Sequence, residues 1–466
     1  MVNEAQQNWL GWLPSHGPRA LSIACVLLWT TACAQYSAVD KPLTKWTPDR
    51  SDLEFEQIEG DRDPELLVMV AFSGGGSRAS SLAYGVLEEL NEIVISQATP
   101  SRTLLQEIDM ISSVSGGSFT AAYFALHGEK IFTDFEPLFL RKNVEGALFW
   151  KLFNPINWAK LLSQSYGRSD LAADYYDKIL FDEATLSGFH KPSAPLVILN
   201  TTDLATGSRF PLMPQLLDVI CADYGSYPVS RAVAASSAVP IVLSPITLES
   251  YAGDCGYETP DWLTAALKDD TLTPRKRQAQ QVQAYLDHKQ RPWLHLVDGG
   301  ISDNLGLRAY YDGLNIVSAP GSALNSQHHK HARNILIISV DARAHHDSKW
   351  QLERYAPSLF EVISSVSADQ ISRYSEDTVT IVRELFSQQA RKASTPDRKV
   401  TFSFVEVSFN QVEDGAEREY LNNIGTSFSL SDKEVDHLIA AGRKVLRNSP
   451  ELKAFLQDVQ NRQKSQ

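Results

Sequence analysis

A serine on a tight bend is the first feature of the sequence that could carry out chemistry. Residues 112–118 read SSVSGGS and separate an apolar run from a stretch typical of a helix. Serine and glycine clusters are often plain linkers. The same pattern is typical of a nucleophile elbow, in which a strained turn between a strand and a helix exposes one serine oxygen. Under that second interpretation, Ser115 is the nucleophile of an acyl-transfer reaction.

The elbow motif departs from its usual form at one position. Gly117 occupies the last glycine of the G-x-S-x-G pattern, whereas Ser113 stands where the first glycine is expected. Serine is small enough for that crowded position. Because short matches of this kind are common by chance, acyl transfer also requires a base and oxyanion donors elsewhere in the chain.

Residues 73–78, SGGGSR, could supply the oxyanion donors. Successive glycines leave backbone N–H groups free to face an anion, and the helix that follows adds its positive end. A nucleotide phosphate loop is the alternative, but the Lys-Ser or Lys-Thr pair of a Walker loop is absent. The glycines at 74–76 are therefore compatible with an oxyanion hole, and Arg78 adds positive charge nearby.

An aspartate is the candidate base. Asp298 ends the apolar run of residues 293–298 and is followed by two glycines, which leave its carboxylate unobstructed. An ordinary Asp-Gly turn is the alternative. Histidine is the more usual base, but only His345 and His346 follow a comparable strand end, and they remain a reserve candidate. The pattern favours a two-residue arrangement of Ser115 and Asp298.

Repeated strand–turn–helix units must position these residues. The apolar run at 65–76 ends in the glycine loop, and residues 77–94 then show helical spacing. The run at 108–114 leads in the same way into Ser115 and a second helix. Further apolar runs lie at 194–207, 293–298 and 334–344. Because unbroken apolar runs are typical of strands buried on both faces, the pattern predicts an α/β fold with a mainly parallel central sheet flanked by helices.

The order of these motifs resembles the patatin-like phospholipase family. Gly-Gly-Gly-x-Arg, a serine elbow and Asp-Gly-Gly follow one another as they do in that family. The segments LAYGVLEEL, NTTDLATG, AASSAVPIVLSP and DGGISDNLGL also resemble it. The resemblance covers roughly residues 66–345. Besides Ser113, it departs at Ala79, where many relatives have glycine.

The resemblance implies a patatin-like three-layer sandwich, related to cytosolic phospholipase A2, with a Ser–Asp dyad and no histidine. Carried over by position, it makes Ser115 the nucleophile and Asp298 the base. Gly74, Gly75 and Gly76 become the oxyanion hole, with Arg78 beside it. It implies a serine lipid acyl hydrolase that cleaves phospholipid or other lipid esters at a membrane surface without a metal or other cofactor. Two alternatives stay open: a lipid-binding envelope protein without turnover, and an acyltransferase that uses the same acyl-enzyme.

Charge excludes one class of partner. The chain has 466 residues and a formal net charge of −13. Nucleic-acid binding requires a basic footprint. We therefore expect no nucleic-acid partner.

The N-terminus predicts export. Residues 20–29 form an apolar run after Arg19, too short to span a membrane but of the size of a secretory signal core. Cleavage after Ala34 is one interpretation. In the other, TTAC resembles a bacterial lipobox with Thr30 in place of its usual leucine, and Cys33 becomes lipidated. A buried N-terminal helix is the third. Export favours a bacterial cell-envelope protein, membrane-anchored or periplasmic.

Two cysteines remain once this region is set aside. Cys25 lies in the signal region and Cys33 is the lipidation candidate, which leaves Cys221 and Cys255. In an exported protein an even remainder predicts one disulfide. In a cytosolic protein both would be free thiols.

Composition divides the chain into a signal sequence (1–33), a tether (34–60), a catalytic domain (61–345) with a helical insertion or cap (130–190), and a C-terminal extension packed on that domain (346–466). The insertion contains ALFWKLFNPINWAKLL, which mixes aromatic residues with lysines. This stretch either packs on the core or faces lipid, because Trp and Lys together favour membrane interfaces. Near the end, Ser431 and Glu434 form a capping box that predicts the start of a helix.

Overall fold

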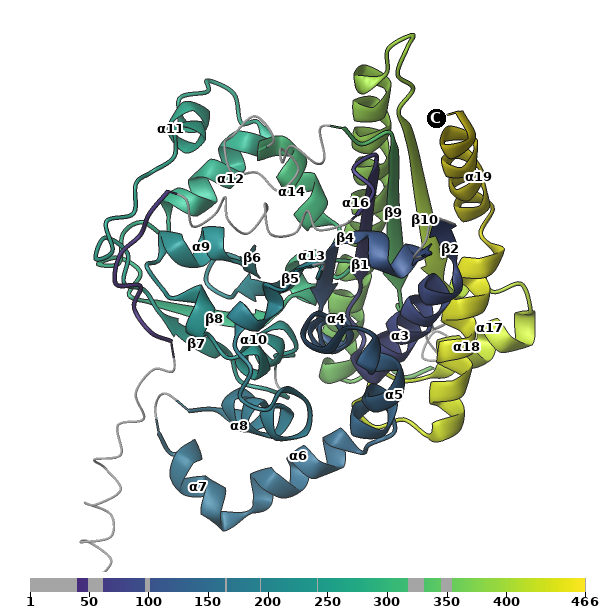
Figure 1. Ribbon diagram of the computed structural model, residues 1–466. Helices are drawn as coiled ribbons and strands as arrows, with labels where there is room; N and C mark the ends of the chain where they lie inside the picture. Colours follow the sequence, from purple (N-terminus) through teal and green to yellow (C-terminus); the bar gives the residue numbers. More distant parts are fainter. Residues whose placement is uncertain are drawn as a thin grey trace, which may run out of the picture.

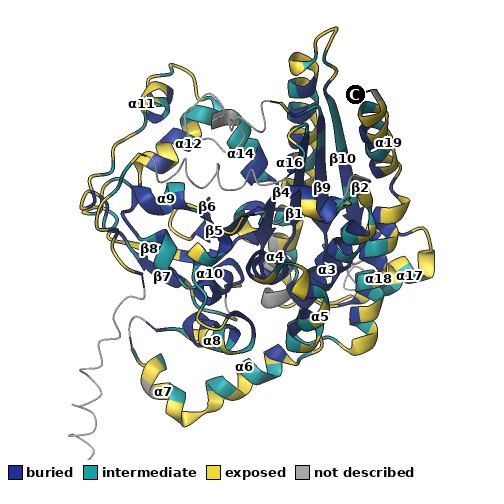
Figure 2. Ribbon diagram, in the orientation of Figure 1, coloured by how far each residue is buried: buried dark blue, intermediate teal, exposed yellow. Residues whose placement is uncertain are grey.

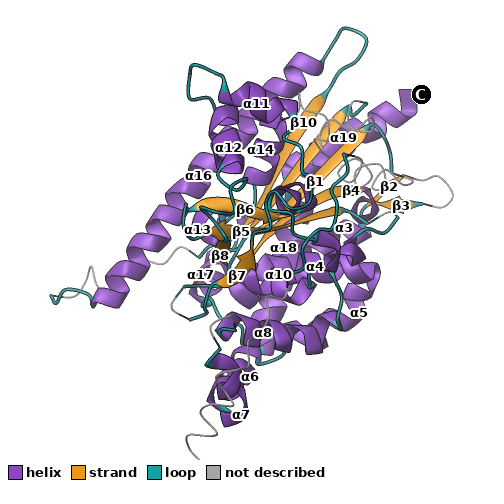
Figure 3. Cartoon of the chain, turned by 90° about the vertical axis from the view of Figure 1, so that its left-hand side faces the viewer, coloured by secondary structure: helices purple, strands orange, loops and turns teal. Residues whose placement is uncertain are grey.

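The computed structural model describes residues 40–48, 62–96, 101–163, 166–192, 194–240, 242–316, 331–344 and 354–465. Within these residues an eight-stranded sheet forms the centre of the molecule, and helices cover both of its faces (Figures 1 and 3). The predicted α/β fold with a mainly parallel sheet is confirmed.

The sheet has the strand order β10-β9-β1-β4-β5-β8-β7, and β6 also pairs with β5. Strands β10, β9, β1, β4 and β5 run parallel, whereas β6 and β8 are antiparallel to β5, and β7 is antiparallel to β8. The strands are β1 (Leu66–Phe72), β4 (Ile108–Val114), β5 (Leu196–Asp203), β6 (Ser208–Leu212), β7 (Ile246–Glu249), β8 (Trp293–Asp298), β9 (Asn334–Asp341) and β10 (Thr401–Ser408). A separate hairpin pairs β2 (Val94–Ser96) with β3 (Arg102–Thr103).

The helices fill the remaining layers and the insertions. They are α3 (Gly76–Glu92), α4 (Gly116–His127), α5 (Ile131–Phe135), α6 (Val144–Phe153), α7 (Pro155–Leu161), α8 (Arg168–Tyr176), α9 (Pro214–Val219), α10 (Val229–Ser236), α11 (Asp261–Leu267), α12 (Pro274–Gln283), α13 (Gly300–Asp303), α14 (Arg308–Ile316), α16 (Leu359–Ala393), α17 (Gly415–Asn423), α18 (Asp432–Asn448) and α19 (Pro450–Ser465).

Side chains of β1 alternate between two hydrophobic cores. Val68, Val70 and Phe72 pack into the larger core with residues of α3, α4, α10 and α18. Met69 and Ala71 pack into a second core with residues of α14 and α16. Because a strand points successive side chains to opposite faces, a strand covered on both sides must be apolar throughout, which explains the unbroken run in the sequence.

The residues expected to form a C-terminal extension complete the central sheet. Strand β10 pairs in parallel with β9 along its whole length. Helix α18 begins at the predicted capping box, where the Ser431 hydroxyl accepts from the N–H of Glu434 and the Glu434 carboxylate accepts from the N–H of Ser431. It lies so close to α3 that a Cβ on Gly85 would be 2.2 Å from the carbonyl oxygen of Ile439.

Residues 40–48, which belong to the predicted tether, pack against the domain. The N–H of Leu43 donates to the carbonyl of Cys221 at 2.7 Å, and that of Trp46 donates to the carbonyl of Cys255 at 2.9 Å. Leu43 forms a small buried cluster with the two cysteines, and Trp46 packs against it. This docking is possible only in the folded domain, so a local reading of a polar stretch could not show it.

Cys221 and Cys255 form a disulfide in the structure. They are separated by 34 positions. Closing a loop of that size lowers the conformational entropy of the unfolded chain, which stabilises the folded protein by roughly 3 to 4 kcal/mol. The bond fixes the segment on which residues 40–48 pack.

The insertion at 130–190 is helical. Its first part, α5, packs into the main core through Ile131 and Phe135. Helices α6 and α7 instead extend along the lower edge of the molecule in Figure 1, and Figure 2 shows many of their residues exposed. Among the described helices, none has the length and apolar character needed to cross a membrane.

Candidate active site

Ser115 stands at a strained turn between β4 and α4. Its backbone has φ 50° and ψ −120°, a conformation that non-glycine residues rarely adopt. The following glycines allow the close approach that holds this turn. A Cβ on Gly116 would be 2.0 Å from the carbonyl oxygen of Gly76, and one on Gly117 would be 2.7 Å from the Cβ of Phe72. The turn has the geometry of a nucleophile elbow.

The departure at Ser113 has a structural reason. Its hydroxyl donates to the carbonyl of Ile198 in β5 at 3.3 Å and accepts from the hydroxyl of Ser118 at 3.2 Å. Ser118 in turn lies 2.9 Å from the hydroxyl of Ser236, which accepts from the N–H of Ser115 at 3.0 Å. A hydroxyl in place of the usual glycine thus joins a buried network beneath the elbow.

Strand β5 brings Ser115 and Asp298 together. Its Asn200 lies opposite Val114 of β4, and the next residue, Thr201, lies opposite Asp298 of β8. Strand β6 pairs with the same part of β5 and occupies its other edge. Because a strand has only two edges for pairing, β4 and β8 share one edge and meet end to end. Asp298 therefore lies beside Ser115, the residue that follows Val114.

The carboxylate of Asp298 is held in a buried position. Asp298 is 7% exposed, and its Oδ1 accepts from the N–H of Gly300 at 2.7 Å. Burial raises the pKa of Asp298 to about 6, against the opposing effects of the Gly300 N–H and of a hydrogen bond from the Ser115 side chain. A carboxylate of raised pKa in contact with a serine hydroxyl can act as a general base near neutral pH.

The glycine loop lies against Ser115 at the start of α3. A Cβ on Gly74 would be 3.3 Å from the Cβ of Ser115. Gly75 has φ 140° and Gly76 has φ 60°, both in the region that favours glycine. Because they occupy the N-cap and first position of α3, their N–H groups have no acceptor within the helix. These two N–H groups can hold an oxyanion.

Gly74 has a different role from the one expected. Its N–H donates to the backbone carbonyl of Asn304 at 3.0 Å, so this N–H is already used. A Cβ on Gly74 would lie 2.6 Å from the Oδ1 of Asn304, and one on Gly300 would lie 2.8 Å from it. Asn304 therefore fastens the glycine loop to the aspartate turn, and a side chain at either glycine would displace it.

Arg78 supports the loop from behind. Its Nε donates to the carbonyl of Ala342 at 2.8 Å and its Nη1 to the carbonyl of Ile424 at 2.6 Å. Burial lowers the pKa of Arg78 to about 10, an effect that Asp341 opposes. The guanidinium lies next to Gly75, as expected, but it binds backbone carbonyls. Its evident role is to fix the loop in place.

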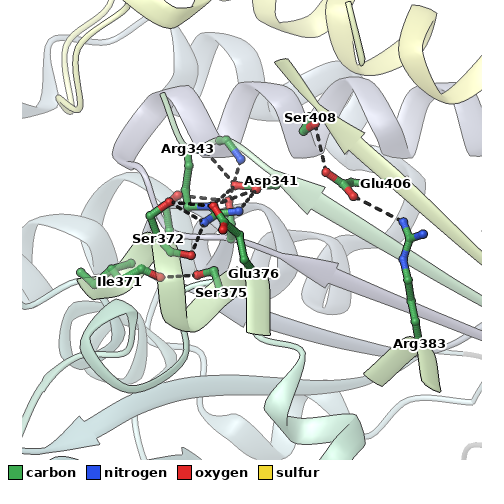
Figure 4. Close-up of polar contacts among 12 residues, drawn as sticks. Asp341, Arg343, Ile371, Ser372, Ser375, Glu376, Arg383, Glu406 and Ser408 are labelled. Atoms are coloured by element: carbon green, nitrogen blue, oxygen red, sulfur yellow. Dashed lines mark hydrogen bonds and ion pairs between the residues drawn. The ribbon is translucent and has the colours of Figure 1, made fainter. Parts of the chain in front are cut away.

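The strand end that Arg78 contacts is braced by α16. Arg343 pairs with Asp341 at the end of β9, with 2.7 Å between Nη2 and Oδ2 (Figure 4). Its Nη1 also donates to the carbonyl of Ser372 in α16 at 3.0 Å. Helix α16 thereby holds the strand end behind the glycine loop.

Four supporting residues were not singled out from the sequence, although each lies in a segment that carries the family resemblance. Asn200 donates to the carbonyl of Ser113 at 2.9 Å. Ser236 and Asn304 contact the elbow and the glycine loop as described above. Asp203 pairs with Arg291 at 2.6 Å and fixes the turn after β5. Each is a polar residue within a motif, and Asn200, Asp203 and Ser236 are also buried; polar residues inside these motifs are the signal that could have identified them.

Histidine is not placed at the dyad in the part of the chain that the structure describes. His127 ends α4, away from its Ser115 end, and the imidazole of His295 faces the hydroxyl of Thr247 on β7 at 3.0 Å. The reserve candidates His345 and His346 lie outside the described residues.

A sequence model of the patatin-like phospholipase family matches residues 70–311, more than half of the chain. The chain belongs to the patatin-like phospholipase family. The matched region contains the glycine loop, the elbow and the aspartate turn. Family membership supports a lipid acyl hydrolase activity for this patatin-like chain.

Several solved structures align with this chain at low sequence identity. Human GIVD cytosolic phospholipase A2 aligns over 91% of this chain and 68% of its own, with 13% identity and a TM-score of 0.44. The same human enzyme in complex with methyl gamma-linolenyl fluorophosphonate aligns over 91% and 65%, with 14% identity and a TM-score of 0.42. VipD from Legionella pneumophila aligns over 85% and 68%, with 11% identity and a TM-score of 0.31. No curated protein matches the sequence significantly.

Proposed function

We propose that this patatin-like protein is a serine lipid acyl hydrolase of the phospholipase A or lysophospholipase type, with Ser115 as nucleophile and Asp298 as base. The observation that carries the proposal is the buried Asp298 carboxylate, which the pairing of β4 and β8 along one edge of β5 places beside a serine on a strained elbow. The glycine loop beside that serine supplies N–H groups for an oxyanion. Nucleophile, base and oxyanion donors are the parts that acyl transfer requires.

The proposed reaction has two steps. Asp298 takes the proton of Ser115 as the serine oxygen attacks the ester carbonyl carbon, and the N–H groups of Gly75 and Gly76 hold the resulting oxyanion. The ester C–O bond then breaks, and the leaving alcohol takes the proton from Asp298. A water molecule then gives a proton to the same carboxylate and attacks the acyl carbon. The bond between that carbon and the Ser115 oxygen breaks, Asp298 returns the proton to Ser115, and the fatty acid is released. Every proton is carried by Asp298, so the steps require no metal ion.

Turnover of a fluorogenic short-chain ester tests this proposal against the alternatives. A hydrolase releases the fluorophore continuously with water as the only acceptor. A lipid-binding protein without turnover gives no release above background. An acyltransferase gives slow release that rises when an alcohol or lysolipid acceptor is added, because the acceptor then competes with water for the acyl-enzyme.

The pH dependence of this hydrolysis follows from the base. Asp298 must be ionised to accept the proton, and burial raises its pKa to about 6. We expect kcat/KM to fall as the pH drops below about 6 and to reach a plateau above about pH 7. The profile should be measured with a soluble ester between about pH 4.5 and 8.5, with folding checked by circular dichroism at each pH. A flat profile across this interval in folded protein contradicts Asp298 as the base.

We further propose that the protein is exported in a bacterium and anchored in the cell envelope through a lipid on Cys33. Residues 1–39 lie outside the described residues, so the proposal rests on the apolar run and the lipobox-like TTAC. Pairing of Cys221 with Cys255 supports it, because disulfides persist in oxidising compartments.

Metabolic labelling in a bacterial host tests the anchor. The wild-type protein should incorporate a palmitate analogue and pellet with membranes, because several acyl chains hold a protein far more firmly than one. Cys33→Ser should lose the label. A soluble, unlabelled protein that begins at Gln35 would establish simple cleavage instead, and an uncleaved chain would contradict export.

A further inference from the structure

Helices α6 and α7 leave a cluster of large apolar side chains uncovered. The most exposed members are Phe149 (56%), Trp150 (76%), Phe153 (54%), Ile156 (81%), Trp158 (52%) and Leu162 (84%). They occur within a single short stretch of the chain, and we call residues 144–162 the α6–α7 arm. Figure 2 shows this arm largely exposed at the lower edge of the molecule. The ring of Phe149 lies 4.5 Å from that of Phe153 and 6.3 Å from that of Trp150, between centroids. Clustering of exposed apolar side chains is typical of an interaction site.

Several polar groups of the arm have hydrogen-bond partners inside the arm. The Asn154 side chain caps α7 by accepting from the N–H of Ile156 at 3.1 Å, and the indole N–H of Trp158 donates to the carbonyl of Leu152 at 3.1 Å. Asn157 donates to the carbonyl of Lys151 at 2.7 Å. These three polar groups are satisfied within the arm, so they do not oppose the loss of water from its exposed face.

The charge of the arm differs in sign from that of the whole protein. Within the arm, Lys151 and Lys160 outnumber the one acidic residue, Glu145, whereas the whole chain carries a net charge of −13. Lys160 pairs with Asp174 at 3.1 Å, and Lys151 lies over the ring of Tyr175, 5.4 Å from its centre. The arm therefore presents tryptophans and lysines together, the composition found where proteins meet a membrane interface.

The arm is joined to the glycine loop of the active site. The carboxylate of Glu145, in the first turn of α6, accepts from the hydroxyl of Ser427 at 2.5 Å. The carbonyl of Ser427 accepts from the N–H of Ser77 at 2.9 Å and would lie 2.6 Å from a Cβ on Gly76. One residue thus contacts both the arm and the oxyanion loop, so the position of the arm is fixed relative to the site.

We propose that the α6–α7 arm is a membrane-docking surface that inserts into the interface of a bilayer containing anionic lipids. The proposal deepens the proposed function, since it names the surface through which a lipid hydrolase would meet its substrate. A bilayer fits better than a second copy of the chain, because two copies would bring surfaces of the same positive sign together, whereas anionic head groups complement the lysines. The exposed tryptophans and aliphatic side chains would lie at the level of the head groups.

Vesicle cosedimentation tests the docking surface without reference to turnover. The full chain carries Cys33→Ser, so that no acyl anchor contributes, and Ser115→Ala, so that vesicle lipid is not consumed. The probe is vesicles of phosphatidylcholine with phosphatidylglycerol, compared with phosphatidylcholine alone. We expect binding that is stronger to the anionic vesicles. Replacing Trp150 and Leu162 by serine should weaken it by about tenfold or more, because two exposed apolar side chains no longer enter the interface.

A matched pair elsewhere on the surface serves as the control. Trp293 and Leu272 are also a tryptophan and a leucine with exposed side chains, at 49% and 59%, and lie outside the arm. Their replacement by serine should leave vesicle binding unchanged. Equal losses in both pairs, or no vesicle binding by the parent chain, would overturn the proposal. The proposal would also be overturned if replacing Trp150 and Leu162 by serine changed only the self-association of the protein, measured by sedimentation velocity without lipid.

A single substitution keeps the test decisive if the arm pair does not fold. Lys151→Glu should weaken binding to the anionic vesicles several-fold and leave binding to phosphatidylcholine alone unchanged, because only the electrostatic attraction is reversed. An unchanged preference for anionic vesicles in this variant would contradict a cationic docking face. Because all these measurements are made on a chain without Ser115, failure of the proposed hydrolase activity would not affect them.

Discussion

Replacing Ser115 by alanine, or Asp298 by asparagine, is expected to abolish ester hydrolysis while the protein stays folded. Alanine removes the oxygen that attacks the ester. Asparagine keeps the shape of the carboxylate, and its side-chain oxygen can still accept the hydrogen bond from the N–H of Gly300. The amide, however, cannot take the proton of Ser115. Loss of a serine nucleophile costs about 10⁶-fold in kcat in a well-studied protease. Both variants should therefore hydrolyse a soluble ester at or near the background rate.

Substitutions of another serine and of the two reserve histidines serve as controls. Ser237→Ala removes a nearby buried hydroxyl that donates to the carbonyl of Val233 at 2.8 Å, and it should retain activity. His345→Ala and His346→Ala should also retain activity, because the proposed base is a carboxylate. If either histidine variant is inactive while Asp298→Asn is active, with overlapping melting curves throughout, the Ser–Asp dyad is wrong.

The strand ends that carry the site could be predicted from local pattern. The runs before Ser115 and Asp298 are mainly apolar, and glycines follow each because the chain must turn sharply there. Strand β4 is buried along its whole length, whereas β8 is exposed at Trp293 and His295 and buried only toward Asp298. The start of α18 could also be predicted from local pattern, because Ser431 and Glu434 bind each other's backbone within one turn. Signals of this kind depend only on neighbours in the sequence.

Pairings between distant segments could not be predicted. The sequence gives no sign that β8 runs antiparallel to β5 and meets the end of β4, which is what sets Asp298 beside Ser115. Nor does it show that Asn304 uses the N–H of Gly74, or that Arg78 binds the carbonyls of Ala342 and Ile424. These contacts join residues far apart in the chain, so only the folded arrangement identifies their partners.

Gly75→Ala is expected to reduce kcat by about 10²- to 10³-fold, the usual cost of losing one oxyanion donor. The cause is backbone conformation more than steric overlap. The nearest atom to a Cβ on Gly75 would be the Cβ of Ala79 at 3.3 Å, so the space is tight without being blocked. A φ of 140° is strained for alanine, and relaxing it turns the N–H of Gly75 away from the oxyanion.

Gly256→Ala separates this effect from general strain. Gly256 also has a positive φ, 75°, and a Cβ there would meet no atom within 4 Å. It follows Cys255, outside the dyad and the glycine loop, so its replacement should lower stability through backbone strain by about 1 kcal/mol and leave kcat within a few-fold of wild type. The comparison requires kcat and the free energy of unfolding for both variants. If Gly75→Ala loses stability as Gly256→Ala does but keeps its kcat, the N–H of Gly75 is not an oxyanion donor, and the hole must be formed by other groups around Ser115.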